Sequence, residues 1–194
     1  DHSAVRITTA RYYTPSGRSI QRPYGEGIDY DEDLSERMDH GEFLNQDSIH
    51  LDSSLKYTTL QGRTVYDGGG IMPDVFVAAD TAERSPYLMK VLFSGVINQF
   101  AFDLADSERK KFEHYGSPER FAREYTISGP VWERFHAEAE KAGVERDAAG
   151  MSRSGRVISE RLKAAIARNI WKDAGYYRIT MASDSIYKAA RAAL

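Results

Sequence analysis

Hydrophobic residues follow two different periods along the chain. Up to about residue 82, apolar and polar residues alternate in short runs, and from Ser85 onward the apolar residues recur about every 3.6 positions. A period of two is typical of strands, and a period of 3.6 is typical of an amphipathic helix. The pattern therefore predicts an α+β chain, with a few strands in residues 1–82 and an all-helical region in residues 83–194.

The first region contains runs of β-branched and aromatic residues that favour strands. We expect a strand from Val5 to Tyr13, a short strand at Arg63–Tyr66 and another at Val75–Val77. Thr14-Pro15-Ser16-Gly17 predicts a tight turn, because proline presets φ at the second position and a type I turn favours glycine at the fourth. Residues 18–21 then return as a short extended segment.

A long polar segment, residues 24–62, separates these predicted strands. It is acidic in its first half, where eight carboxylates stand against one base, Arg37: Glu26, Asp29, Asp31, Glu32, Asp33, Glu36, Asp39 and Glu42. We expect a solvated surface excursion with a helical turn near Leu34–Met38.

Serine, proline and glycine residues indicate where the helices of the second region begin and end. Ser85-Pro86, Ser117-Pro118 and Ser128 with Pro130 are typical helix starts. Ser107 is expected to cap a short helix that stops at Gly116, and Gly143 is expected to end the helix that Ser128 opens.

Apolar residues three or four positions apart predict the buried faces of these helices. We expect one or two turns at Asp147–Ser152, the longest helix from about Ser154 to Asp173, and a last helix from Ser183-Asp184 to the C-terminus. The residues expected to face the core are Leu88, Leu92, Val96, Phe100 and Leu104, then Val131, Phe135, Ala139 and Ala142, and then Ile158, Leu162, Ile166 and Ile170.

Composition excludes several classes of function. The 194 residues include no cysteine, which excludes disulfides, a thiol nucleophile and a cysteine-based metal site. The formal charge of −3 gives no general attraction to nucleic acid or to an anionic membrane. No apolar run reaches the roughly 18 residues of a membrane span, and no signal peptide precedes the first strand. The chain lacks an initiator methionine, so we expect a piece of a longer protein.

Residues 151–194 are basic, with nine cationic side chains against three carboxylates. The cations are scattered around the predicted helices, so we expect most of them to form a solvated face and we expect no nucleic-acid partner. They are Arg153, Arg156, Arg161, Lys163, Arg168, Lys172, Arg178, Lys188 and Arg191, against Glu160, Asp173 and Asp184.

Three patterns suggest ligand binding but fail on spacing. The glycines at 68–70 lead into Ile71-Met72-Pro73-Asp74 and a strand, whereas phosphate loops open a helix. Asp29-x-Asp31-x-Asp33 begins like a calcium loop but lacks its glycine and final glutamate. His40, Glu42 and His50 lack the spacing that puts two imidazoles on one helix face. We therefore expect no cofactor, no cofactor-binding residue and no metal ligand.

A serine three residues before a lysine occurs three times, at Ser53/Lys56, Ser107/Lys110 and Ser185/Lys188. This spacing can place an amine one helical turn from a hydroxyl. None of the three has the companion motifs or the glycine-rich elbow of a serine nucleophile, so all three are interpreted as chance. We expect no catalytic residue in this chain.

Two segments nevertheless resemble a known family. The first is Ile7-Thr8-Thr9-Ala10-Arg11-Tyr12-Tyr13-Thr14-Pro15-Ser16-Gly17-Arg18-Ser19-Ile20-Gln21, and the second is Gly70-Ile71-Met72-Pro73-Asp74. Their order and wording resemble the C-terminal-processing peptidases, also called tail-specific or carboxyl-terminal proteases. The acidic insertion with His40-Gly41-Glu42-Phe43, the approach Gly62-Arg63-Thr64-Val65-Tyr66 and Gly95–Phe100 resemble Bacteroidetes-type members. Asp67 departs from the pattern, since a further glycine is usual there.

The resemblance implies a serine endopeptidase that cleaves proteins near their C-termini. It implies a ClpP/crotonase-like core with a Ser/Lys dyad, in which Lys is the general base, and a preceding PDZ domain that captures substrate C-termini. Both dyad residues precede the segment 7–21 in that family, so none is carried over and the chain alone is expected to be inactive. A periplasmic or cell-envelope location and protein or peptide substrates are implied for the parent protein.

A different class of function is also open. The helical region 83–194 contains many large aromatic residues for a short bundle, among them Trp132, Trp171, Tyr176 and Tyr177. This content suggests a non-catalytic interaction or oligomerisation module, which would make the protein a homo-oligomer or a docking element.

Overall fold

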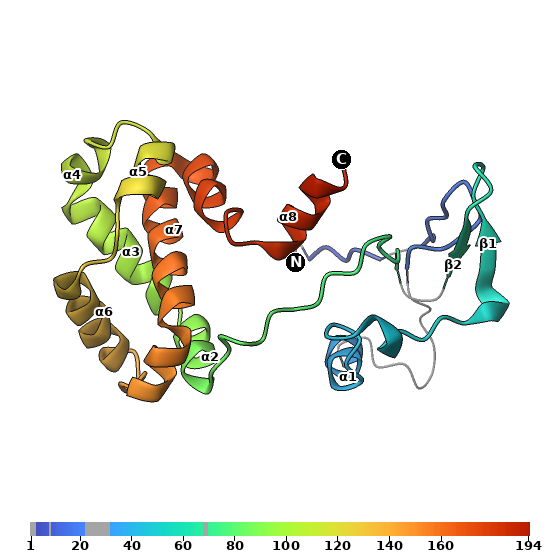
Figure 1. Ribbon diagram of the computed structural model, residues 1–194, viewed down its shortest axis with the longest axis horizontal. Helices are drawn as coiled ribbons and strands as arrows, with labels where there is room; N and C mark the ends of the chain where they lie inside the picture. The colour runs from blue at the N-terminus through green and yellow to red at the C-terminus, as the bar shows by residue number, and fades with distance from the viewer. Residues whose placement is uncertain (1–2, 8, 22–31, 68–69) are drawn as a thin grey trace. The chain divides into compact units, whose positions relative to one another are not determined.

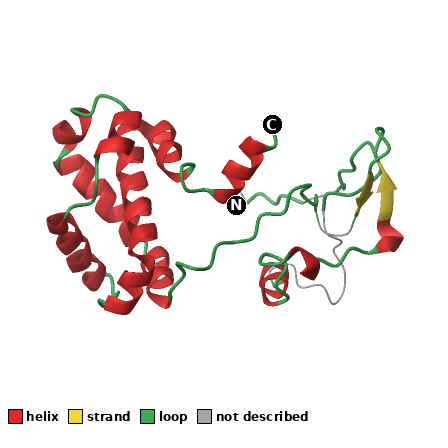
Figure 2. Cartoon of the chain, viewed as in Figure 1, coloured by secondary structure: helices red, strands yellow, loops and turns green. Residues whose placement is uncertain are grey.

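The computed structural model describes residues 3–7, 9–21, 32–67 and 70–194 and divides the chain into two compact units (Figure 1). The first unit is Asp1–Ala79 and the second is Asp80–Leu194. The described residues are mostly helical, with one pair of antiparallel strands (Figure 2), so the coarse α+β class is confirmed. The assignment of residues 1–82 and 83–194 to a peptidase core and its helical domain stays a prediction.

The elements of both units follow in chain order. They are α1 (Asp33–Asp39), the 3₁₀ turns η1 (Gln46–Ser48) and η2 (Ser53–Leu55), β1 (Lys56–Thr58), β2 (Thr64–Tyr66), α2 (Pro86–Phe93), α3 (Val96–Ser107), α4 (Arg109–Glu113), α5 (Pro118–Glu124), α6 (Gly129–Lys141), α7 (Ala148–Thr180) and α8 (Ser185–Ala192).

A small hairpin organises the first unit. β1 and β2 pair antiparallel with Lys56 opposite Tyr66 and Thr58 opposite Thr64, and Val65 between them is buried. The predicted strand at 63–66 is thus confirmed as β2. Its partner β1 lies inside the segment 24–62, where no strand was predicted. The remainder of that segment is exposed, and α1 buries no side chain, as the predicted helical turn near 34–38 requires.

Two other strand predictions are wrong for the described residues. Residues 5–7 and 9–13 form no strand, apart from a single bridge between Tyr13 and Ser19, and residues 75–77 are irregular. Val5 and Ile7 are 83% and 74% exposed. β-branched residues favour an extended backbone, but a strand also needs a neighbouring strand, and no described segment supplies one.

The second unit is a helical bundle built around α7. Helices α2, α3 and α5 pack on α7, and α6 packs on α3 (Figure 1). The largest fully buried side chains come from five helices, so one apolar core is shared by the bundle. They are Phe112, Phe121, Phe135, Leu104, Ile158, Leu162, Ile166 and Val91.

Most predicted helix boundaries are confirmed by their capping bonds. Ser85 Oγ accepts a hydrogen bond from the Leu88 N–H, and Ser117 Oγ accepts one from the Arg120 N–H. Gly143 has φ +82° just after α6 ends, in the left-handed region that favours glycine. Ser128 precedes α6 but makes no side-chain cap. Ser107 is wrong as a cap, because it is the last residue of α3 and its hydroxyl donates back to the Asp103 carbonyl.

The predicted face from Leu88 to Leu104 is interrupted rather than continuous. Gly95 has φ +73°, and the chain bends by 60° between α2 and α3. Leu92 is consequently 41% exposed, although Leu88, Phe100 and Leu104 are buried. The prediction of one inward face is therefore wrong at Leu92, since four-residue spacing does not carry across a break.

α7 is much longer than predicted, because the turn at Asp147–Ser152 is its first turn. Asp147 caps it by accepting a hydrogen bond from the Gly150 N–H. Ile158, Leu162 and Ile166 are buried as predicted and Ile170 is partly buried. Inside it, Lys172 has φ +57° and ψ −145°, so the helix is kinked there. At the end of α6, Ala142 is exposed rather than inward.

Within the described residues, no single helix is long and apolar enough to cross a membrane. α2 and α3 together reach that length and composition only as a bent pair.

Candidate functional site

The turn at residues 14–17 is the best-defined feature of the first motif segment. The Gly17 N–H donates to the Thr14 carbonyl over 2.8 Å, which closes the predicted turn. The Thr14 N–H donates to the Arg18 carbonyl over 2.8 Å, and the Thr14 and Ser16 hydroxyls are 2.8 Å apart. Gly17 has φ +88°, a backbone conformation that a side chain disfavours. The turn is thus held by backbone and side chains together.

Residues that follow this turn contact the end of β2. Arg18 is 8% exposed, and its guanidinium lies 3.5 Å from the Tyr66 carbonyl. The Ser19 N–H donates to the Asp67 carboxylate over 3.2 Å. A Cβ added at Gly17 would lie 3.5 Å from the Tyr57 ring, so the turn also packs on β1. The first motif segment is therefore anchored on the hairpin that leads into the second.

Asp67 accounts for the departure from the family pattern. A glycine at this position could not accept the Ser19 N–H through a side chain, whereas the Asp67 carboxylate does. Sequence reasoning missed this role, because nothing near Asp67 in the chain indicates a partner 48 residues away. Gly68 and Gly69 of the glycine run lie outside the described residues, and Gly70 has φ +101°.

A polar cavity of about 280 Å³ lies beside this contact, within the first unit. Its lining includes His40, Glu42, His50, Asp67 and the segment Gly70–Pro73. The predicted set of two histidines and one glutamate is thus brought to one cavity.

The cavity's titratable groups are engaged with their neighbours. Arg37 holds Glu42 in an ion pair of 2.8 Å, and His50 Nδ1 lies 2.9 Å from the Ser48 carbonyl. No group of three metal-ligating side chains converges anywhere in the described ranges. Asp29 and Asp31 of the calcium-like pattern lie outside those ranges.

The three Ser/Lys pairs show no dyad geometry. No hydrogen bond joins Ser53 to Lys56, Ser107 to Lys110 or Ser185 to Lys188 among the interactions of the described residues. The Ser107 hydroxyl is instead bonded to the carbonyl of Asp103 over 2.7 Å. Lys163 has its pKa lowered by burial, but its Nζ donates to the Ala122 carbonyl over 2.6 Å and no hydroxyl stands beside it.

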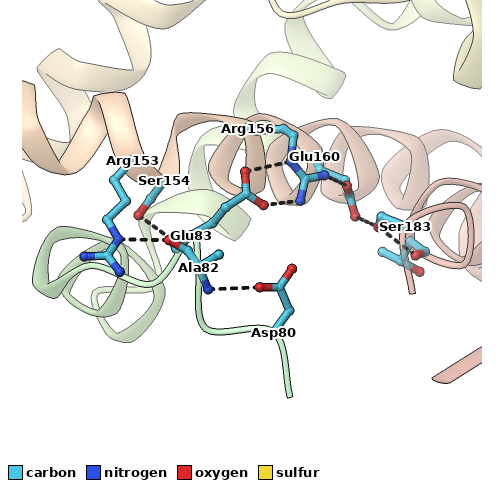
Figure 3. A network of polar contacts seen from close by, with 9 residues as sticks. Asp80, Ala82, Glu83, Arg153, Ser154, Arg156, Glu160 and Ser183 are labelled. Carbon is cyan, nitrogen blue, oxygen red and sulfur yellow. Dashed lines mark hydrogen bonds and ion pairs between the residues drawn. The ribbon is translucent and has the colours of Figure 1, made fainter. Parts of the chain in front are cut away.

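The second unit contains a polar network that fastens residues 80–85 to α7 (Figure 3). Ser154 is fully buried, and its hydroxyl lies 2.7 Å from the Glu83 carbonyl and 2.7 Å from the Ser85 hydroxyl. Arg153 Nε donates to the Ala82 carbonyl over 2.9 Å. Because Ser85 also caps α2, Ser154 connects the start of α2 to the middle of the longest helix.

Charged groups extend this network along α7. Arg156 donates to both carboxylate oxygens of Glu83, and it lies 3.4 Å from Glu160, which in turn accepts a hydrogen bond from Ser183 (Figure 3). The hydrogen bond from Arg156 lowers the pKa of Glu83, and the Glu83 carboxylate raises the pKa of Arg156. The pair is exposed, so it positions the segment more than it stabilises it.

Buried tyrosines and one histidine line the bundle between α2, α6 and the neighbouring loops. Tyr87 Oη lies 3.4 Å from His136 Nδ1, and Trp132 stacks on the His136 ring. Burial lowers the pKa of His136 and raises that of Tyr87, with the charge of Arg146 lowering both. Burial also raises the pKa of Tyr125 to about 12. These groups are packed neutral, which is the state of a structural core.

The aromatic residues that suggested a docking role pack mostly inside the unit. Trp132, Trp171 and Tyr176 lie against the core, and Trp171 contacts the Phe121 ring at 5.2 Å, whereas Tyr177 is 49% exposed. The described residues thus hold no assembled catalytic constellation. The feature with the closest tie to a function is the contact between the two motif segments.

Comparison with known proteins gives one family match. A model described as a family of unknown function (DUF8443) matches residues 87–173, which is less than half of the chain. The matched segment runs from α2 to the kink in α7, and there the chain is similar to that family. No curated protein and no solved structure matches the chain.

Proposed function

We propose that this chain is the C-terminal part of a serine endopeptidase of the C-terminal-processing type. The proposal rests on the resemblance of segments 7–21 and 70–74 to that family. The observation that supports it best is the hydrogen bond from the Ser19 N–H to Asp67, together with the packing of Gly17 on Tyr57. Two motifs that are 50 residues apart thereby meet in one compact unit, as parts of one site-supporting structure would.

The exposed start of the chain also supports this proposal. In residues 9–12 no backbone hydrogen bond joins another described residue, and Val5, Ile7 and Tyr12 expose most of their side-chain surface. Such a segment has the composition and the free backbone groups to add a strand to a sheet. In our proposal that sheet belongs to a ClpP/crotonase-like core, and the segment 14–19 braces it from behind.

The reacting groups in this proposal are a serine and a lysine encoded before residue 1. The lysine would act as general base for the serine hydroxyl, and a PDZ domain would present the C-terminal tails of protein substrates. The chain's own residues would hold the core strand in place, and the chain alone would cleave nothing. A periplasmic or cell-envelope location belongs to the same proposal.

The reading frame that precedes residue 1 tests this proposal. It is expected to encode a lysine shortly before Ile7 and, further upstream, a serine at the start of a helix rich in small residues. A frame that encodes neither residue, or a stop codon immediately upstream, would contradict the proposal.

An interaction or oligomerisation module is the second candidate function. It is favoured by large apolar side chains on the surface of the helical unit, where Phe93 is 83%, Phe102 55% and Ile186 65% exposed. Size-exclusion chromatography with light scattering tests it. A mass that grows with concentration supports the module, and a monomer at every concentration argues against self-association.

A further inference from the structure

A groove of about 930 Å³ lies in the second unit, between α5, the C-terminal part of α7 and α8. α8 buries none of its side chains, and it joins α7 through a short turn that Asp184 caps by accepting a hydrogen bond from the Tyr187 N–H. The groove is therefore walled on one side by a helix that the bundle does not need for its own core.

The kink in α7 shapes the opposite wall of this groove. Lys172 takes a positive φ, and the chain then returns so closely that a Cβ added at Gly175 would lie 2.5 Å from the Ala167 carbonyl oxygen. This return presents Tyr177, Arg178 and Met181 to the groove. The wall is thus set by backbone geometry, so the groove does not depend on a flexible loop.

Positive charge dominates the groove's rim. Arg123, Arg178, Lys188 and Arg191 line it, and Glu119 is its single carboxylate. Arg123 pairs with Glu124 at 2.9 Å. In the part of the chain that the structure describes, the other three cations have no ion pair, whereas arginines elsewhere in the unit, such as Arg146 and Arg156, each pair with two carboxylates.

The groove's floor is apolar. Four alanines line it together with Tyr177 and Met181, which are 49% and 37% exposed. A hollow of this kind gains from burying apolar side chains, and its rim gains from nearby negative charge. The two requirements are met together by a peptide that has apolar residues on one face and carboxylates beside them.

We propose that this groove binds an acidic, amphipathic polypeptide segment. The occupant's apolar side chains cover the floor, and its carboxylates pair with Arg178, Lys188 and Arg191. A concave site favours an inserted polypeptide over a flat bilayer, which would meet projecting residues instead. The overall charge of −3 gives no long-range attraction to nucleic acid. This inference stands independently of the proposed peptidase function.

The test uses the full chain and a fluorescein-labelled helical peptide of about 14 residues, roughly four helical turns, with leucines on one face and glutamates beside them. Two matched peptides carry Gln or Lys in place of every Glu. Fluorescence anisotropy is expected to give saturable binding of the Glu peptide, at least about tenfold weaker binding of the Gln peptide, and no binding of the Lys peptide.

Two variants separate the groove from the general charge of the protein. The double variant Arg178→Glu/Arg191→Glu is expected to weaken binding of the Glu peptide about tenfold or more. Lys90→Glu/Lys110→Glu makes the same change in net charge on α2 and α4, away from the groove, and is expected to change binding less than about twofold. Ala182→Trp fills the floor without altering charge and is expected to abolish binding, with the circular dichroism spectrum unchanged.

Several results would overturn the proposal. They are equal binding of the Glu and Lys peptides, unchanged binding by Arg178→Glu/Arg191→Glu, and a loss with Lys90→Glu/Lys110→Glu as large as with the groove variant. Tighter binding of phosphatidylserine vesicles or of a single-stranded oligonucleotide than of the Glu peptide would likewise overturn it, because the groove would then serve a different class of partner.

Discussion

The backbone N–H of Ser19 donates a hydrogen bond to the Asp67 carboxylate over 3.2 Å, across 48 positions of sequence. This bond joins the turn of the first motif segment to the residue that leads from β2 into the second. Because Ser19 also bridges to Tyr13, the bond holds both arms of the turn against the hairpin. The contact gives the two segments a shared structural role as a brace.

Removing the carboxylate should loosen this brace. Asp67→Ala is expected to cost about 1 kcal/mol locally, because a hydrogen bond to a charged acceptor is lost, and to make the Ser19 amide exchange roughly fivefold faster. Hydrogen exchange followed by NMR measures this directly at Ser19.

Asp74→Ala is the matched control for that exchange measurement. Asp74 pairs with Arg63 on the surface, and both side chains are more than half exposed, so the Ser19 amide should be unaffected. Identical exchange in the Asp67 variant and in the native chain would show that the brace is absent in solution.

Ser154→Ala should destabilise the helical unit by about 2 kcal/mol, because the Glu83 carbonyl and the buried Ser85 hydroxyl lose their partner. Urea unfolding followed by tryptophan fluorescence reports on this unit alone, since Trp132 and Trp171 both lie in it. The neighbouring Arg153→Ala removes only an exposed hydrogen bond to Ala82 and should cost less than about 0.5 kcal/mol. Equal losses in the two variants would disprove a special role for the buried hydroxyl.

Lys172→Gly is expected to raise stability by about 1 kcal/mol, because glycine adopts the φ of +57° at the kink without the strain that a side chain brings. Ser152→Gly, in a regular turn of the same helix, should lower stability by about 0.5 kcal/mol. Urea midpoints of both variants measure these changes. A loss of stability in Lys172→Gly would mean that α7 runs straight through this position.

His136 should make the helical unit less stable in mild acid. Its folded pKa is lowered from 6.5 by burial, so the unfolded chain binds the proton more tightly. The contribution of neutral His136 is full above pH 6.5 and is lost as the pH falls below 6.5 towards the folded pKa. The urea midpoint should drop between about pH 7.5 and about pH 5.5, and His136→Gln should reduce that drop. An unchanged drop in the variant would assign it to other groups.

Local features of this fold could be predicted from sequence, because their causes lie within a few residues. Ser85 and Ser117 cap helices as expected, since a serine before a proline needs only its own helix for the capping bond. The Thr14–Gly17 turn closes for the same reason, through one bond between its ends.

Features that depend on distant partners could not be predicted. Residues 5–13 have strand composition, yet pairing requires another strand, and among the described residues only Ser19 offers a bridge. The kink at Lys172 has no glycine or proline to announce it, and the close approach of Gly175 to Ala167 emerges only in three dimensions. The cations of the groove are scattered along the sequence and gather only because α7 turns back and α8 follows.

The most direct test of the account is peptidase activity in the protein extended by the residues encoded upstream. The extended protein is expected to cleave a substrate that ends in an unstructured C-terminal tail, and replacing the upstream serine by alanine should abolish cleavage. The present chain alone should leave the same substrate intact. Cleavage by the chain alone that survives the combined change Ser53→Ala, Ser107→Ala and Ser185→Ala, or no cleavage by the extended protein, would contradict the account.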